Sequence, residues 1–108
     1  MDEIISARLH ITDEQIAAFC QKWQIVRFEL FGSALRDDFD DQSDVDVLVT
    51  FAQEPRWRFA DLLDIEDALK AMFHRNVDLV ERPLLEQSPN WIRRRAILET
   101  ARPVYASA

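Results

Sequence analysis

Apolar side chains recur along the chain at two spacings, and each spacing predicts a different kind of element. A repeat of three or four residues, which puts side chains on one face of a helix, links Ile16, Phe19, Cys20 and Trp23. Thr12 stands just before this stripe and Gln15 follows three residues later, which is the pattern of a capping box. The chain is therefore expected to begin its first helix near Thr12.

Alternation of apolar and polar residues, or a short apolar run, marks the expected strands. The elements expected after the first helix are a strand at 26–31, a short helix at 33–38, a strand at 44–51, a helix at 58–73, a strand at 76–80 and a helix from 88 to about 101. Val104 and Tyr105 form either a short edge strand or a packed tail. This order predicts a small α/β (α+β) domain whose mixed sheet is flanked by helices.

Composition narrows the class of protein. The 108 residues are expected to form a single domain, 1–108. A net charge of −7 argues against a direct nucleic-acid binder, which needs a basic surface. No apolar run approaches the roughly 20 residues of a membrane span, and the acidic N-terminal residues lack the pattern of a signal peptide. Cys20, the only cysteine, is expected in the core, and its lack of a partner fits a reducing, cytoplasmic location.

Aspartate is concentrated in one short segment, where it fills six of the ten positions from Asp37 to Asp46. A solvated loop explains most of this run, but Asp44 and Asp46 alternate with valines at the start of an expected strand. Their side chains would share one face of that strand, with α-carbons roughly 7 Å apart. Asp78 lies in another apolar run and joins them if its strand pairs beside theirs. Three such carboxylates suit Mg²⁺ or Mn²⁺.

Gly32, the only glycine, ends an apolar run and is followed directly by Ser33. A backbone without a β-carbon can approach a phosphate closely, and the N-terminus of the short helix expected here favours anions. Arg36, one turn further on, could add a charge-assisted contact. A plain turn with a serine cap would explain Gly32 and Ser33 alone, but the aspartates downstream favour a site for a nucleoside triphosphate and its metal ions.

The segments 30–39 and 43–49, Leu-Phe-Gly-Ser-Ala-Leu-Arg-Asp-Asp-Phe and Ser-Asp-Val-Asp-Val-Leu-Val, together resemble the signature of minimal nucleotidyltransferases. These proteins belong to the DNA polymerase β-like superfamily, so the resemblance implies a palm-like nucleotidyltransferase fold. The chain is most similar to MNT-type antitoxins, which are encoded beside HEPN-domain ribonuclease toxins. Such antitoxins transfer AMP from ATP to a tyrosine of the toxin, which implies a HEPN-domain protein as partner.

The resemblance also implies roles for individual residues. Asp44 and Asp46 would bind two Mg²⁺ ions, and Asp78 would complete the metal site and help to deprotonate the attacking hydroxyl. Gly32 and Ser33 would hold the β- and γ-phosphates of ATP. The chain departs from the family where Arg36 is followed by Asp37 rather than glycine, and Leu35 stands where alanine is usual.

Three functions are compatible with these residues. The first is a protein adenylyltransferase antitoxin. The length of the chain favours a protein acceptor, because 108 residues leave little to shape a pocket for a second small substrate. The second is an antitoxin that acts by direct binding with little catalysis. The third is a nucleotidyltransferase of a small-molecule alcohol, working with a separate helical subunit. Trp57 and Trp91 are expected either to pack normally or to anchor a protein interface, and the sequence does not separate the first two functions.

Overall fold

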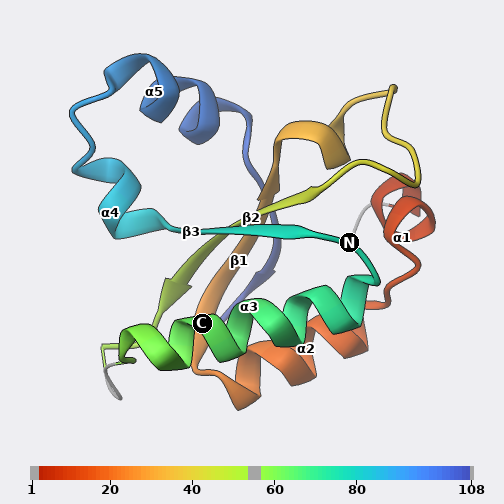
Figure 1. Cartoon of the computed structure of the whole chain (residues 1–108), viewed down its shortest axis with the longest axis horizontal. Coiled ribbons are helices and arrows are strands. Elements are labelled where there is room, and N and C mark those ends of the chain that lie inside the picture. Colours follow the sequence, from red (N-terminus) through yellow and green to blue (C-terminus); the bar gives the residue numbers. More distant parts are fainter. Residues whose placement is uncertain (1–2, 54–56, 108) are drawn as a thin grey trace.

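The computed structural model describes residues 3–53 and 57–107 (Figure 1). Its helices are α1 (Glu3–Leu9), α2 (Asp13–Lys22), the 3-10 helix η1 (Gly32–Leu35), α3 (Phe59–Phe73), α4 (Arg82–Glu86) and α5 (Trp91–Thr100). Its strands are β1 (Ile25–Phe31), β2 (Val45–Phe51), β3 (Val77–Glu81) and β4 (Arg102–Ala106). The expected mixed sheet flanked by helices is confirmed.

The strands form one sheet in the order β3-β2-β1-β4. β1 pairs antiparallel with β2 and with β4, whereas β2 and β3 are parallel and are joined by α3. The start of β2 therefore lies between the end of β1 and the start of β3. In this register Phe31 is opposite Asp46, and Asp46 is opposite Asp78.

The two faces of the sheet are covered differently. α1, α2 and α3 bury one face, and the main core includes Phe28, Leu30, Val45, Val47 and Val77 from the strands. Figure 1 shows α2 and α3 side by side along this face, with α4 and α5 set apart from them. A smaller cluster of Phe31, Leu48, Leu85 and Ile97 joins the opposite face to α4 and α5. Because side chains alternate along a strand, Asp46 and Asp78 belong to this second face.

Local signals explain most of the element boundaries. α2 begins as expected, because the Thr12 hydroxyl accepts from Gln15 N–H at 3.2 Å and Gln15 Oε1 accepts from Thr12 N–H at 2.9 Å. Cys20 lies in the core as expected, and burial raises the pKa of its thiol to about 12. Val104 and Tyr105 belong to an edge strand, β4, rather than to a packed tail.

Four details differ from the sequence-based expectations. α1 was not expected, although Ile5 and Leu9 are buried one turn apart on it. α4 was also not expected, because five residues are too few to show a helical repeat. α5 begins later than expected, because Asn90, rather than Ser88, accepts the capping bond from Arg93 N–H.

The fourth difference is the short helix expected at 33–38, which is instead the 3-10 turn η1 and ends at Leu35. Gly32 begins this turn in the left-handed region, with φ of 68°. A β-carbon added at Gly32 would collide with Oδ2 of Asp46. Gly32 therefore has two roles, since it adopts the left-handed backbone of the turn and leaves space for the Asp46 carboxylate.

Among the residues that the structure describes, Glu29 is the one charged residue that is buried, at 2% exposure. Its carboxylate accepts from Arg82 Nη1 at 2.6 Å and pairs with Arg27 Nε at 2.9 Å. A buried carboxylate needs such partners, and here they fix the start of α4 to β1. None of the helices in the described part of the chain combines the length and the apolar character of a membrane span.

We predict that Gly32→Ala lowers the free energy of unfolding by about 2 kcal/mol or more, because the left-handed backbone and the collision with Asp46 both disfavour a β-carbon. Urea unfolding measures this loss. The same substitution made in an Asp46→Ala background should cost less, because only the backbone strain remains. An equal cost in both backgrounds would show that Asp46 does not restrict Gly32.

Candidate functional site

The predicted carboxylates lie at one corner of the sheet, on the face that α4 and α5 partly cover. Asp46 is the second residue of β2, and Asp78 is the second residue of β3. Their parallel pairing puts them side by side, with strands about 4.8 Å apart. Asp44 directly precedes β2 and is exposed, as is Asp78, whereas Asp46 is half-buried. The backbone register thus brings together the three positions that the sequence singled out.

Asp46 is the electrostatic centre of this corner. Burial raises the pKa of its carboxyl above the ordinary range, and the neighbouring charges of Asp78 and Asp44 raise it further. A hydrogen bond from Ser33 N–H, at 3.4 Å to Oδ2, and the charge of Arg36 act in the opposite direction. A half-buried carboxylate with two acidic neighbours is an environment that favours a cation.

The Gly32–Ser33 turn is tied to the aspartates rather than left open. Ser33 Oγ donates to the backbone carbonyl of Asp44 at 2.5 Å, and Ser33 N–H faces Asp46. The groups that the sequence predicts as phosphate ligands are therefore next to the predicted metal ligands, and in this structure they bond to them. Binding of a phosphate at Ser33 requires these bonds to be exchanged.

Arg36 follows the turn and carries an exposed guanidinium. Its Nε pairs with Asp38 Oδ1 at 3.3 Å, but both side chains are largely exposed, so this pair contributes little and leaves the cation accessible. Asp37, the residue after Arg36, is turned toward Arg8 Nη2 at 3.3 Å. Arg8 also donates to the carbonyl of Ala34 at 3.0 Å, so Arg8 attaches α1 to the turn and to the residues that follow it.

The donor set fits a divalent cation by its chemistry. Asp44, Asp46 and Asp78 supply hard carboxylate oxygens from one face, and the missing β-carbon of Gly32 leaves room for one of them. As the side chains stand, no group of three Asp, Glu, His or Cys residues among those described is placed to hold a metal ion. Like charges repel, so without a cation the three carboxylates have no reason to converge.

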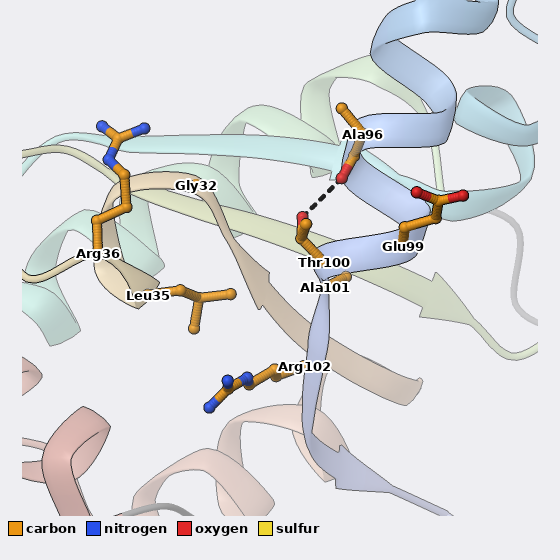
Figure 2. A pocket seen from close by; sticks show the side chains of 8 residues that line it. All are labelled: Gly32, Leu35, Arg36, Ala96, Glu99, Thr100, Ala101 and Arg102. Atoms are coloured by element: carbon orange, nitrogen blue, oxygen red, sulfur yellow. Dashed lines mark hydrogen bonds between the residues drawn. The ribbon is translucent and has the colours of Figure 1, made fainter.

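A cavity of about 620 Å³ opens beside Gly32 and Arg36. Figure 2 shows that its walls come from distant parts of the chain: Leu35 and Arg36 from the turn and its end, Ala96, Glu99 and Thr100 from α5, and Ala101 and Arg102 from the residues that follow it. The sequence did not point to these residues of α5 and β4. No local motif marks them, because the pairing of β4 with β1 and the packing of Ile97 in one cluster with Phe31 bring them to the site.

A second, smaller cavity of about 340 Å³ is lined by Asp44 together with Lys70, His74 and Arg75. Arg75 Nη1 donates to the carbonyls of Asp40 and Ser43, at 2.9 and 3.0 Å, and so shapes the acidic loop. Of the three predicted carboxylates, only Asp44 lines either of these two cavities.

The two tryptophans left open by the sequence behave differently. Trp57 is half-buried, packs edge-on against Trp23 with ring centroids 5.7 Å apart, and donates from its indole N–H to the Trp23 carbonyl at 3.0 Å. Trp91 is 58% exposed at the start of α5, Ile92 next to it is 65% exposed, and Leu84 on α4 is 63% exposed. Trp57 thus packs normally, whereas Trp91 is available to a partner.

Comparison with solved structures finds proteins of the same fold. One chain of a crystal structure of a toxin-antitoxin with AMP-PNP has a TM-score of 0.68 at 16% identity, over 90% of this chain and 75% of that one. One chain of a complex of tri-AMPylated Shewanella oneidensis HEPN toxin with MNT antitoxin has a TM-score of 0.58 at 15% identity, over 88% and 70%. At these identities the likeness establishes the fold.

A protein described as a minimal nucleotidyltransferase has a TM-score of 0.66 at 26% identity, over 95% of this chain and 96% of that one. No curated protein matches the chain. The nucleotidyltransferase domain family matches residues 13–104, which contain all the predicted site residues. The chain therefore belongs to the nucleotidyltransferase domain family, whose fold implies a nucleotide substrate and the general use of divalent metal ions.

Proposed function

We propose that this nucleotidyltransferase is an antitoxin that transfers AMP from ATP to a tyrosine of a HEPN-domain toxin. The observation that carries the proposal is the pairing of Asp46 with Asp78 directly beside Gly32. This arrangement supports a site in which metal-binding carboxylates lie next to the residues predicted to bind phosphate. The likeness to toxin-antitoxin structures, one of them with an AMP-modified toxin, favours a protein acceptor of this kind.

In the proposed reaction the tyrosine oxygen attacks the α-phosphorus of ATP. A new phosphorus–oxygen bond forms, the bond from the α-phosphorus to the bridging oxygen of the β-phosphate breaks, and pyrophosphate leaves with the bonding electrons. Asp78, which is exposed at the edge of the site, accepts the tyrosine proton. Two Mg²⁺ ions held by Asp44, Asp46 and Asp78 would supply charge neutralisation at the reacting oxygens, and Mn²⁺ would substitute for them.

The remaining predicted residues act by positioning. The Gly32 turn would hold the β- and γ-phosphates at its backbone, and its missing β-carbon leaves space for the Asp46 carboxylate beside them. Ser33 gives up its hydrogen bonds to Asp46 and Asp44 and donates to phosphate oxygens instead. The bond to Asp46 is long, at 3.4 Å, so little free energy is lost when it breaks. Arg36 adds a cation whose present partner, Asp38, is held only at the surface.

Direct binding without catalysis is the second candidate, favoured by the exposed Leu84, Trp91 and Ile92. Large exposed apolar side chains, a tryptophan among them, are typical of protein interfaces. An antitoxin that only binds would use this surface and would not need the carboxylates.

We expect Mg²⁺ to raise the melting temperature of the chain, because a cation relieves the repulsion among the three aspartates. At ten times the dissociation constant the gain is about 1.4 kcal/mol, or roughly 6–10 °C for a domain near this size. Differential scanning fluorimetry at constant ionic strength measures it, with an Asp44→Asn/Asp46→Asn variant as the unresponsive control. A wild-type melting temperature that is independent of Mg²⁺ would rule out the metal site.

Asp46→Asn should raise the free energy of unfolding at about pH 7 in the absence of divalent cations. The folded state raises the pKa of Asp46, so its contribution is most favourable below the ordinary aspartate pKa and is lost as the pH rises through the raised value. The gain from asparagine should therefore shrink at acid pH, below the raised pKa, where Asp46 is itself protonated. Urea unfolding at both pH values tests this, and a gain that grows on acidification would contradict it.

Intact-mass spectrometry tests the proposed reaction. The chain is mixed with ATP, Mg²⁺ and a HEPN-domain protein encoded next to it, beside the Asp44→Asn/Asp46→Asn control. We expect the partner to gain one or more units of about 329 Da, the mass of ATP minus pyrophosphate, with wild-type chain only. Co-elution of the two proteins without any gain in mass would favour the antitoxin that acts by binding alone.

A further inference from the structure

We propose that the first turn of α5 docks on α3 of a second copy of this chain, so that molecules associate head to tail. Of the six large apolar residues that are exposed among those described, four form two pairs, one on α3 and one on α5. None of the four is predicted to bind metal or phosphate, so this association is independent of the proposed transfer of AMP.

The first turn of α5 presents one of the two surfaces. Trp91 and Ile92 are 58% and 65% exposed there, and Arg93 directly after them is exposed as well. Arg95, one turn after Trp91, is also exposed and shares its charge with Glu99 Oε1 at 2.9 Å. Tryptophan, aliphatic side chains and arginine are a composition typical of the centre of a protein interface. We call Trp91, Ile92 and Arg93 the α5 surface.

The exposed side of α3 presents the other surface. Phe59 is 75% exposed and Leu63 is 48% exposed, and residues four apart lie on the same side of a helix. Asp67 follows Leu63 at the same spacing, and Asp64 is next to it; both aspartates are exposed, and neither forms an ion pair with a described residue. We call Phe59, Leu63, Asp64 and Asp67 the α3 surface.

The two helices carry opposite charge. α5 contains three arginines and one glutamate, whereas α3 contains four acidic residues and one lysine. That lysine, Lys70, pairs with Glu66 at 3.4 Å, and Arg58 adds one exposed cation just before α3. Complementary charges favour contact between α5 and α3, whereas like charges disfavour contact between two α5 or two α3 surfaces. The partner that fits the α5 surface is therefore an acidic helix with exposed apolar residues, which is what α3 provides.

The fold keeps the two surfaces of one molecule apart. α3 packs through Ile65, Leu69 and Phe73 on one face of the sheet, whereas α5 packs through Ile97 on the other. Figure 1 shows α3 and α5 on opposite sides of the strands. Contact between the surfaces therefore requires a second copy. Each molecule in such a contact keeps one surface of each kind uncovered, so association continues beyond two copies into a ring or a longer chain.

Sedimentation velocity over a series of concentrations tests the association. We expect the average mass of the wild-type chain to rise past that of a dimer. Trp91→Ala/Ile92→Ala and Phe59→Ala/Leu63→Ala should each raise the dissociation constant about tenfold or more, equivalent to 1.4 kcal/mol. Ile4→Ala, which truncates a 60% exposed residue on α1, is the matched control and should associate like the wild type.

A mixture of the two double variants is the decisive sample. Each variant retains one intact surface, so the mixture contains one intact contact and should form a dimer of wild-type affinity that does not grow further. Arg93→Glu, which leaves the apolar residues in place, should weaken the self-association of the otherwise wild-type chain several-fold, because it places an acid opposite the acidic α3 surface.

The opposite results would overturn the proposal. A wild-type chain that stays monomeric up to about 1 mM, a contact free energy weaker than about 4 kcal/mol, has no such interface. Loss of association in only one double variant, or a mixture that forms no dimer, would show that like surfaces meet. Wild-type association in Arg93→Glu would remove the role of charge. A monomeric chain that binds the HEPN-domain protein through Trp91 and Ile92 would assign the α5 surface to that partner, and the proposed transfer of AMP would stand.

Discussion

The contact between Gly32 and the carboxylate of Asp46 is the constraint on which the rest of the site depends. No β-carbon fits at Gly32, because Asp46 Oδ2 already lies where it would project. The antiparallel pairing of β1 with β2 brings the turn against Asp46, and the parallel pairing of β2 with β3 then sets Asp78 beside Asp46. The absence of a β-carbon at Gly32 thus allows the turn to pack closely against the acidic corner of the sheet.

This corner is built at the expense of stability. Burial and two acidic neighbours raise the pKa of Asp46, whereas Glu29, buried more deeply on the same face, is matched by Arg82 and Arg27. Glu29, which links β1 to α4, is therefore neutralised by two arginines, whereas Asp46 has no equivalent ion-pair partner. Such an imbalance is typical of sites that are completed by a ligand.

Fold and site were predictable to different degrees. Apolar spacing and capping residues were enough to predict the strands, α2 and α3. These signals are local, and the apolar residues that carry them are indeed mostly buried in the structure. α4 has too few residues for a periodic signal, and the turn after Gly32 is shorter than expected because Arg36 is extended. The exposed Trp91 could not be told from a packed one, since its exposure depends on what the rest of the chain leaves uncovered.

The sequence by itself determined the family and the mixed α/β architecture, and it was enough to predict Gly32, Ser33 and the three aspartates as site residues. Each of these depends on residues close together in the chain or on a strong periodic pattern. Only the tertiary structure decided that Ser33 bonds to Asp44 and Asp46, and that the end of α5 and Arg102 close a cavity beside Gly32. The physical reason is that strand pairing joins residues far apart along the chain, and such contacts leave no local trace in the sequence.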